Sequence, residues 1–439
     1  MRRHVFGTRR NVTTPYPSAS LLCPRVFLST TPMPHTFATP LSSRVVSRYP
    51  NAAEAGIELS VVIPCLNEAD TIGICVEKAV RAIRDNGIRG EVIVADNGSS
   101  DDSREIAAER GARVVPVREK GYGSALMGGI AAARGTYILM GDADDSYDFN
   151  EIPRFVQKLR EGFELVQGCR LERGGGTVKP GAMPFLHRWW GNPMFSWMAR
   201  LWFRTPINDI HCGMRGFRKD SYQRLALRCT GMEFASEMVI KASLQKQRIA
   251  EVPIVLHPDG RKSGRRHLRT FRDGWRHLRF YLMFSPRWLF LWPGALLALL
   301  GLAGYAVAMP SLTIGRVGFD VHTLLFASVA IIAGYQAALF AIFTKVFAAG
   351  AGLLPHDERV TVFSKAASLE RGVITGAVAL LTGLILLGGA VLQWRAANFG
   401  ALDYRHVMRW VIPGMTFTLL GIQTVLSSFF LSILGLGRR

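Results

Sequence analysis

The sequence predicts an α/β domain with a mostly parallel sheet, followed by a domain of four membrane-spanning helices. Short apolar runs alternate with segments of helical periodicity between residues 59 and 140, a pattern typical of βαβ units. Charged residues are common up to about residue 287 and scarce after it, where four long apolar runs follow. The length of 439 residues is sufficient for two or three such units.

Residues 1–57 are predicted to be a basic extension that precedes the α/β domain. Residues 1–53 contain no aspartate or glutamate, several arginines and many serines, threonines and prolines, which is typical of an organellar transit peptide. A disordered extension and a later start at Met33 are the alternatives. No sustained apolar run is present, so a cleaved secretory signal is not predicted.

The α/β domain is expected over residues 58–265. Strands are predicted where apolar runs are bounded by turn residues, and helices where apolar residues recur every three to four positions. In chain order these are a strand at 59–64, a helix at 69–86, a strand at 91–95, a helix at 103–110, a strand at 112–117, a helix at 123–134 and a strand at 137–140.

Polar clusters follow three of these strands, at Pro64–Glu68, Asp96–Asp101 and Asp142–Asp145. Ligands of parallel sheets bind beyond the carboxyl ends of the strands. We therefore expect the three clusters to converge on one crevice.

An amphipathic helix is expected at residues 266–285, between the two domains. Its apolar face is formed at helical spacing by Leu268, Phe271, Trp275, Leu278 and Leu282, and arginines fill the remaining face. Such a helix is predicted to lie in the head-group region of a membrane, where each basic residue contributes about 1 kcal/mol. The alternative is a helix packed on the α/β domain.

The predicted membrane domain covers residues 286–435. Its apolar runs lie near 288–309, 321–344, 372–393 and 410–434, and each reaches the ~20 residues that span a bilayer. The basic residues that set its orientation are Lys345, Arg359, Lys365 and Arg371 in one loop and Arg438-Arg439 at the end, against Arg395, Arg405 and Arg409 on the other side. The balance favours a catalytic domain and both termini in the cytoplasm. We expect the plasma (inner) membrane, or an organellar membrane if residues 1–53 are a transit peptide.

The formal net charge of +20 calls for an anionic partner, which can be a membrane surface or a phosphate-bearing substrate. Nucleic acid is not expected, because no zinc-finger, homeodomain or RNA-recognition signature is present. The six cysteines form no C-x-x-C pair, so we expect reduced, buried thiols, which fits a cytoplasmic domain.

The segment Asp142-Ala143-Asp144-Asp145 follows a buried strand directly. Carboxylates at a strand end can bind a hard divalent cation, and the cation can clamp a diphosphate and stabilise the charge that develops on it as a leaving group. An acidic turn without a ligand is the alternative.

Other polar residues of the clusters have two interpretations each. Asp96 and Asn97 can hold the ribose and base of a nucleotide, or they can cap the following helix. Asn67 and Glu68 have the same ambiguity. The sequence Gly121-Tyr122-Gly123 lacks the third glycine of a dinucleotide fingerprint and predicts a tight turn before a helix.

Later in the chain, Arg215 follows a glycine turn and suits bidentate phosphate recognition, with Asp209 to orient it or the substrate. Glu237 lies in an apolar helical pattern, where a carboxylate is costly unless it is paired or working. A salt bridge is its alternative. Arg261 can grip a donor diphosphate, an acceptor phosphate or lipid head groups.

In combination these motifs make residues 58–285 similar to family 2 glycosyltransferases with a GT-A fold, and among them to the polyprenyl-phosphate and dolichyl-phosphate sugar synthases. The motifs are Val61-Val62-Ile63-Pro64-Cys65-Leu66-Asn67-Glu68, Val94-Ala95-Asp96-Asn97-Gly98-Ser99, Asp142-Ala143-Asp144, Gly168-Cys169-Arg170, Cys212-Gly213-Met214-Arg215 and Arg248-Ile249-Ala250-Glu251-Val252-Pro253.

The resemblance implies an inverting transfer with Mg²⁺ or Mn²⁺, and it implies roles for individual residues. The metal would be bound by Asp142 and Asp144. Pro64, Glu68 and Asp96 would contact the nucleotide, Arg215 and Arg261 would contact phosphates, and Glu237 matches a carboxylate that the family places in the active-site region. Together with the residue-level interpretations above, this gives an expected set of donor-binding residues, Pro64, Asn67, Glu68, Asp96, Asn97, Asp142, Arg170 and Arg261, and of catalytic residues, Asp144, Asp145, Arg215 and Glu237. The sequence departs from the family's pattern at Asn97, Ser146 and Arg265-Arg266, which leaves the donor open.

The sequence thus predicts a membrane-bound enzyme that moves a sugar from a UDP- or GDP-sugar to a polyprenyl or dolichyl phosphate, with a homo-oligomer left open. A phosphomonoester is largely ionised at pH 7 and needs no strong general base. Alternatives are a transferase that uses another lipid or a glycan, including a processive synthase, and a non-catalytic membrane scaffold. The Gln-x-x-Arg-Trp motif of processive synthases is absent from the sequence.

Overall fold

The structure is a computed structural model that describes residues 56–261, 270–350 and 369–436. The expectations for residues 1–53, for Arg265-Arg266, for Arg359 and Lys365, and for Arg438-Arg439 lie outside these residues.

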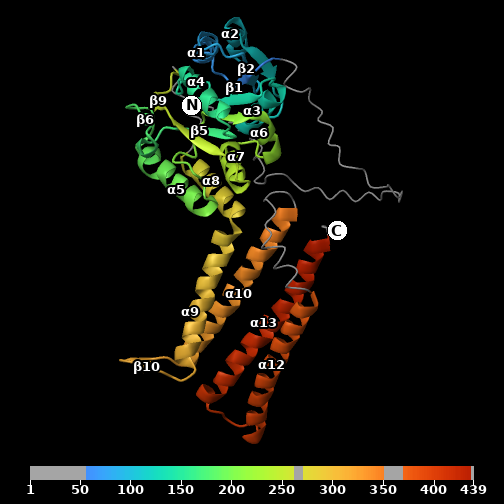
Figure 1. Ribbon diagram of the computed structural model, residues 1–439. Helices are drawn as coiled ribbons and strands as arrows, with labels where there is room; N and C mark the ends of the chain where they lie inside the picture. The colour runs from blue at the N-terminus through green and yellow to red at the C-terminus, as the bar shows by residue number, and fades with distance from the viewer. Residues whose placement is uncertain (1–55, 262–269, 351–368, 437–439) are drawn as a thin grey trace, which may run out of the picture. The chain divides into compact units, whose positions relative to one another are not determined.

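The α/β domain is built on a seven-stranded sheet in the order β3-β2-β1-β4-β7-β5-β8 (Figure 1). Its strands are β1 (Leu59–Cys65), β2 (Gly90–Asp96), β3 (Arg113–Pro116), β4 (Tyr137–Met140), β5 (Leu165–Cys169), β7 (Arg215–Arg218) and β8 (Ile249–Pro253). All neighbouring pairs are parallel except the two made by β7. The predicted mostly parallel sheet is confirmed.

The helices of this domain are α1 (Ile72–Asp85), α2 (Ser103–Glu109), α3 (Tyr122–Ala132), α4 (Ile152–Arg160), α5 (Asn192–Phe203), α6 (Lys219–Leu225) and α7 (Glu233–Leu244). Short pieces complete it: η1 (Phe149–Glu151), η2 (Glu172–Gly174), β6 (Thr177–Val178), η3 (His187–Gly191) and β9 (Val255–Leu256). The seven elements predicted between residues 59 and 140 are all present, each within three residues of its expected start.

Two hydrophobic cores lie on opposite faces of the sheet, because successive side chains of a strand point to opposite sides. Val61 and Ile63 of β1 belong to the core that α1 and α4 cover. Val62, between them, belongs to the core that α3, α5 and α7 cover. Full burial on both faces explains why β1 reads as a continuous apolar run.

Register aligns the carboxyl ends of the central strands. Cys65 at the end of β1 pairs with Asp96 at the end of β2, and Val62 pairs with Met140 at the end of β4. The loops after these strands therefore leave the sheet on the same side.

Helix α8 (Thr270–Phe284) packs on the α/β domain by one face and leaves another exposed. Tyr281 is fully buried, with edge-to-face contacts to Phe195 and Phe203 of α5. Trp275 and Met283 are 61% and 54% exposed. The structure thus shows the packing on the α/β domain, and the location of the other face in the head-group region stays a prediction.

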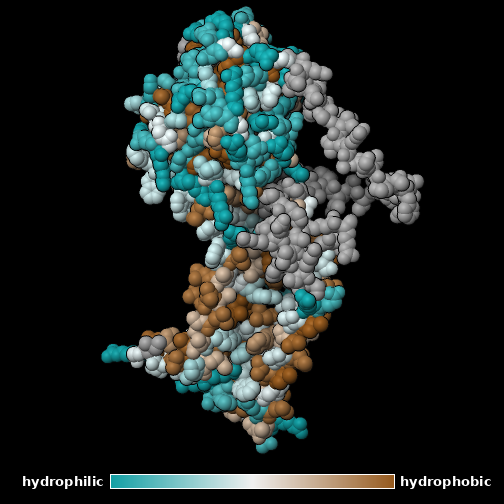
Figure 2. All heavy atoms as spheres, in the orientation of Figure 1, coloured by the Kyte–Doolittle hydropathy of each residue, from teal (hydrophilic) through white to brown (hydrophobic). Residues whose placement is uncertain are grey.

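Four helices are long and apolar enough to span a membrane: Arg287–Ala308, Val321–Gly350, Leu369–Ala396 and Tyr404–Leu434. They comprise η4 (Arg287–Leu291) with α9 (Trp292–Ala308), α10 (Val321–Gly350), α12 (Leu369–Ala396) and α13 (Tyr404–Leu436), and β10 (Thr313–Ile314) and β11 (Val317–Gly318) form a hairpin between α9 and α10. The four predicted spans are confirmed, and the last three helices extend beyond the expected limits. Figure 2 shows the apolar surface of these helices.

The spanning helices pair as two antiparallel hairpins with glycines at the contacts. Gly294 and Gly334 bring α9 against α10, and Gly376 and Gly421 bring α12 against α13. Close approach of backbones through small residues is the usual basis of helix packing in a bilayer.

Hydroxyl groups link the two hairpins. The Tyr305 hydroxyl lies 2.6 Å from Ser328 Oγ and 3.1 Å from Thr416 Oγ1, and the Tyr335 hydroxyl lies 2.7 Å from Thr424 Oγ1. These pairs bring α10 and α13 together in parallel.

Substitution of a contact glycine should loosen the second hairpin. A Cβ at Gly383 would lie 2.5 Å from the backbone nitrogen of Thr418, whereas a Cβ at Gly388 of the same helix would meet nothing within 4 Å. Alanine raises helix propensity by up to about 1 kcal/mol at either position. We expect Gly383→Ala to lower the thermal unfolding midpoint of the purified protein, and Gly388→Ala to leave it unchanged or raise it. Equal midpoints for the two variants would contradict this packing.

Candidate active site

The loops after β1 and β2 are joined by hydrogen bonds at the edge of the sheet. Asn67, with a left-handed φ of 57°, accepts a bond from the Ser100 backbone N–H at 2.8 Å through its side-chain oxygen. The Glu68 backbone N–H donates to Ser103 Oγ at 2.8 Å, and the Ala69 N–H donates to Asp101 at 3.1 Å. Two of the three predicted clusters therefore adjoin, and their own side chains hold them together.

Asp96 and Asn97 are buried, and both organise loops. The Asp96 carboxylate accepts the backbone N–H groups of Gly98 and Ser99 at 3.1 and 3.0 Å. The side-chain amide of Asn97 donates one hydrogen bond to the Val117 carbonyl and one to the Glu119 carbonyl. The asparagine that departs from the family's aspartate thus ties the β2 loop to the segment before α3.

Asp142 lies at the end of β4 against a tyrosine. The Tyr122 hydroxyl donates to Asp142 Oδ1 at 2.9 Å. Burial and the neighbouring charge of Asp144 raise the pKa of Asp142 to about 6. Burial also raises the pKa of Tyr122, so the tyrosine keeps the proton that it donates.

Asp144 faces an arginine that also holds Glu68. Arg261 donates to the two Glu68 carboxylate oxygens at 2.6 and 2.5 Å, and its guanidinium lies 3.6 Å from Asp144 Oδ2. The other Asp144 oxygen accepts from Ser146 N–H and Oγ at 3.1 and 2.7 Å. Arg261 thus joins the β1 loop to the β4 loop, and the third cluster meets the first as expected.

Asp145 points elsewhere. It has a left-handed φ of 59°, and its carboxylate pairs with Lys78 of α1 at 2.8 Å. This ion pair anchors the acidic loop to α1. In the structure, Asp145, which was predicted to be catalytic, therefore makes an anchoring contact.

Arg170 follows β5 and forms a bidentate pair with the fully buried Asp209, at 2.7 and 2.9 Å. Glu251 holds the Asp209 loop in turn, by accepting the N–H groups of Asn208 and Asp209. Asp209 therefore orients Arg170, and not Arg215 as the sequence suggested.

The structure engages Arg215 within the protein, and its phosphate contact stays a prediction. Arg215 is 0% exposed, and its guanidinium donates to the carbonyls of Ala235 at 2.5 Å and Cys212 at 2.7 Å. The side chain of this β7 residue points into the core beside α7, where burial lowers its pKa. It holds the segment before β7 in place.

Glu237 also belongs to the core. Its carboxylate lies 2.8 Å from Lys241 Nζ, one turn along α7, and accepts the N–H groups of Arg228 and Cys229 at 3.0 and 2.8 Å. Of the two interpretations of Glu237, the ion pair is the one that the structure shows. Both carboxylate oxygens are thus engaged within the core, and the catalytic role expected for Glu237 stays a prediction.

Sequence reasoning missed Tyr122 and Tyr147. Tyr147 is buried, and its hydroxyl accepts the Gly213 N–H at 2.8 Å and lies 3.4 Å from Arg170. The position of Tyr122 directly after the Gly121 turn, at the start of a helix, was a usable signal. No local pattern distinguished Tyr147.

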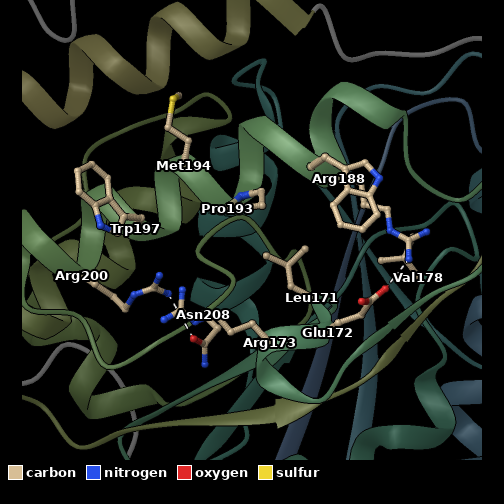
Figure 3. Close-up of a pocket in the computed structure, with 11 residues that line it drawn as sticks. Leu171, Glu172, Arg173, Val178, Arg188, Pro193, Met194, Trp197, Arg200 and Asn208 are labelled. Atoms are coloured by element: carbon tan, nitrogen blue, oxygen red, sulfur yellow. Dashed lines mark hydrogen bonds and ion pairs between the residues drawn. The ribbon is translucent and has the colours of Figure 1, made fainter.

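A second feature missed by sequence reasoning is an exposed aromatic segment before and within α5. Its exposed apolar side chains are Phe185, Leu186, Trp189, Trp190, Met194, Trp197 and Leu201. Beside it lies a pocket of about 480 Å³, in which Trp189, Met194 and Trp197 share the lining with Arg173, Arg188 and Arg200 (Figure 3). Apolar side chains and arginines in one pocket suit an amphipathic anion.

Among the described residues, no group of three or more His, Cys, Asp or Glu side chains is arranged to hold a metal ion. Asp142 and Asp144 are nevertheless chemically suited to one. Two adjacent carboxylates, one with a raised pKa, provide hard oxygen ligands whose repulsion a cation would relieve. A cation here would take its other ligands from a bound phosphate and water.

Comparison with known proteins gives matches in both parts of the chain. The model of glycosyl transferase family 2 matches residues 60–226, and that of the glycosyltransferase family 2 C-terminal transmembrane region matches residues 342–435. The low-salt glycan biosynthesis hexosyltransferase Agl6 of Haloferax volcanii is 39% identical over 86% of this chain and 89% of its own.

Two further similarities cover about half of the chain. The dolichyl-phosphate hexose transferase of Haloferax volcanii is 32% identical over 49% of this chain and 89% of its own. A crystal structure of glucosyl-3-phosphoglycerate synthase from Mycobacterium tuberculosis covers 53% of this chain and 78% of its own, with 22% identity and a TM-score of 0.41.

Neutralising Asp142 should stabilise the fold. The folded-state pKa of about 6 is above the ordinary aspartate pKa of 3.8, so ionisation of Asp142 destabilises the folded state as pH rises between these values. We expect Asp142→Asn to raise the unfolding midpoint at pH 8. The difference from the wild type should grow between pH 4 and 6 and level off above about 7. A pH-independent difference would contradict the raised pKa.

Glu237→Gln should lower the free energy of unfolding. It leaves Lys241 buried without its counter-ion, which costs about 3 kcal/mol of unfolding free energy. The exposed pair of Glu77 and Arg81 provides a control, since Glu77→Gln should cost under about 1 kcal/mol. Adding Lys241→Met to Glu237→Gln should recover part of the loss in thermal unfolding. A stable Glu237→Gln variant would contradict the structural role.

Proposed function

The chain belongs to glycosyltransferase family 2 and is an integral membrane protein, and from this premise we propose that it moves a hexose from a nucleotide-sugar to a polyprenyl or dolichyl phosphate. The observation that carries the proposal is the convergence of Glu68, Arg261, Asp142 and Asp144 at the carboxyl edge of the sheet. The names of the two Haloferax relatives, a hexosyltransferase and a dolichyl-phosphate hexose transferase, support the choice of sugar and acceptor.

The donor side is assigned to the loops after β1, β2 and β4. A nucleoside diphosphate brings two negative charges to this edge, and Arg261 is the side chain there whose present partners are all carboxylates: Glu68, Asp144 and Asp259. If the diphosphate replaces one of these carboxylates, the positive charge of Arg261 stays compensated. We infer that donor binding draws Arg261 away from Asp144 and toward the diphosphate.

Asp142 and Asp144 would hold a Mg²⁺ or Mn²⁺ ion together with the donor. When bound, such an ion would stabilise the negative charge on the departing diphosphate. Tyr122 orients the Asp142 carboxylate, and Ser146 orients that of Asp144. These hydrogen bonds hold one oxygen of each carboxylate and leave the other oxygen for the metal ion.

The acceptor side is assigned to the pocket beside the aromatic segment. Arg188 is paired there with Glu172 at 2.6 Å, and Arg200 contacts the Ile207 carbonyl at 3.2 Å. Arginines suit a phosphate, and the exposed tryptophans suit the boundary between head groups and hydrocarbon. This combination supports a lipid phosphate over a soluble sugar.

The proposed transfer is a direct displacement. An acceptor phosphate oxygen forms a bond to the anomeric carbon while the bond from that carbon to the donor diphosphate oxygen breaks, which inverts the configuration. The attacking oxygen is already ionised at pH 7, so no general base is needed. The engagement of Glu237 with Lys241 is consistent with this, because that carboxylate is not required to accept a proton.

The catalytic domain is proposed to face the cytoplasm. The five described cysteines, Cys65, Cys75, Cys169, Cys212 and Cys229, are free thiols. Burial raises the pKa of Cys65 to about 11 and that of Cys169 to about 12, which fits inert thiols in a reducing compartment.

The test is transfer by the purified full-length protein with Mg²⁺ or Mn²⁺, polyprenyl phosphate and a panel of labelled UDP- and GDP-sugars. We expect one donor to give an acid-labile, organic-extractable product. Asp144→Asn should lower kcat at least 100-fold without lowering the thermal unfolding midpoint. Asp85→Asn, an exposed change at the end of α1, is the matched control and should keep wild-type activity.

Turnover with a glycolipid or a growing glycan, and none with polyprenyl phosphate, would overturn the acceptor and favour the alternative transferase. Wild-type activity in Asp144→Asn would overturn the assignment of the donor site.

A further inference from the structure

Asp145 adopts an unusual backbone conformation in the acidic loop after β4. Its φ of 59° is left-handed, and its side chain bonds a different part of the protein from that of Asp144. The Asp144 carboxylate lies 3.6 Å from Arg261, whereas that of Asp145 lies 2.8 Å from Lys78 Nζ. A residue other than glycine keeps a left-handed conformation only where the surrounding contacts enforce it. The shape of this loop therefore depends on its neighbours.

One neighbour of the loop is the segment that carries Arg261. The Gly260 N–H donates to the Asp144 carbonyl at 3.0 Å, and the His257 N–H donates to the Ser146 carbonyl at 2.9 Å. Arg261 adds its contact with the Asp144 carboxylate. Donor binding is proposed to draw Arg261 toward the diphosphate, which would remove this last contact and weaken the support from the segment.

A second neighbour is α1, which is firmly packed on the sheet. Four of its side chains are fully buried in the core: Ile72, Cys75, Val76 and Ala79. Lys78 belongs to the same helix, and its ion pair with Asp145 joins two side chains that are only 31% and 21% exposed. The pair does not involve Arg261. It is therefore a contact that can hold the acidic loop when Arg261 leaves Asp144.

We propose that Lys78 is a positioning residue of the transfer reaction, which holds Asp144 at the donor site through its ion pair with Asp145. The proposal rests on the assignment of the donor and its metal ion to the loops after β1, β2 and β4. Asp144 is one of the two carboxylates assigned to the ion, so a loop that shifted with Arg261 would carry this ligand away from the donor. Lys78 opposes that shift without contacting the donor.

The sign of the effect on metal binding separates positioning from simple electrostatics. Lys78 is a cation beside an acidic loop, and by Coulomb's law alone its removal would strengthen the binding of a divalent cation. Removal of the Asp145 charge alone would weaken it. If the ion pair positions Asp144, loss of either partner weakens binding. Loss of both partners leaves the net charge unchanged, so the double variant isolates the loss of the contact.

The proposal can be tested by titrating the full-length protein with Mn²⁺ in the presence of UDP or GDP, with free Mn²⁺ measured by electron paramagnetic resonance. We expect Lys78→Met to weaken Mn²⁺ binding about threefold and Lys78→Met with Asp145→Asn about fivefold, the range expected for a partly exposed ion pair. Lys78→Arg keeps the pair and should bind Mn²⁺ like the wild type. In the transfer reaction, Lys78→Met should lower kcat about tenfold, because small displacements of a positioned group are costly, and leave the KM for the acceptor unchanged.

Lys158→Met is the matched control, because it removes the same side chain from another ion pair of the domain, with Glu161 at 2.8 Å. It should bind Mn²⁺ like the wild type. Tighter or unchanged Mn²⁺ binding in Lys78→Met, or wild-type binding in the double variant, would contradict the positioning role. So would a lower unfolding midpoint with unchanged Mn²⁺ binding, which is the result of a purely structural ion pair. Failure of the proposed function has a different signature: Mn²⁺ binding that depends on Lys78, and no sugar transfer by the wild type.

Discussion

The repulsion between Asp142 and Asp144 is the constraint on which the site depends. Two carboxylates stand two positions apart at the end of a buried strand, and burial together with the charge of Asp144 raises the pKa of Asp142 to about 6. Arg261 supplies part of the compensation and is itself fixed by Glu68, which comes from a loop 193 residues earlier in the chain. The register of β1, β2 and β4 makes this contact possible, because it places the ends of the strands side by side. The same shortage of positive charge is what a donor-bound metal ion would remedy.

The sequence predicted the sheet, the convergence of its loops and the four spans, because these follow from apolar periodicity and from where strands end. It was less successful with individual charged residues. Arg215 lies in a family motif, and Glu237 and Asp145 were expected to be catalytic, yet the three side chains bond the Ala235 carbonyl, Lys241 and Lys78 within the protein. A motif identifies which residue is present and not which way its side chain points. The spacing of Glu237 and Lys241 by one helical turn was the one local signal for an ion pair.

Buried charge therefore has two uses in this domain. At Arg215 and Glu237 it fixes the loop before β7 and the loop before α7. Glu237 pairs with Lys241 and accepts two backbone N–H groups, whereas Arg215 donates to backbone carbonyls and its Nε has no partner among the described residues. At Asp142, Asp144 and Arg261 the charges are partly exposed and imperfectly matched, which costs stability and leaves capacity for a ligand. The difference between the two groups lies in long-range packing, which explains why residue type and spacing did not separate them. The Asp209 and Arg170 pair is intermediate, since it is buried but adjoins Tyr147 at the crevice.

The proposed lipid acceptor gives a physical reason for the exposed aromatic residues. Trp189, Trp190 and Trp197 would expose a large apolar area to water if they were surrounded by solvent on all sides, and such patches are rare on soluble domains. Helix α8 adds Trp275 and packs on α5 through Tyr281 and Phe195, so the exposed side chains of the two helices belong to one packed unit. Tryptophan is favoured where head groups meet hydrocarbon. A unit that contacts this boundary would present its arginine-lined pocket at the depth where a lipid carries its phosphate, and the acceptor would not have to leave the bilayer to react.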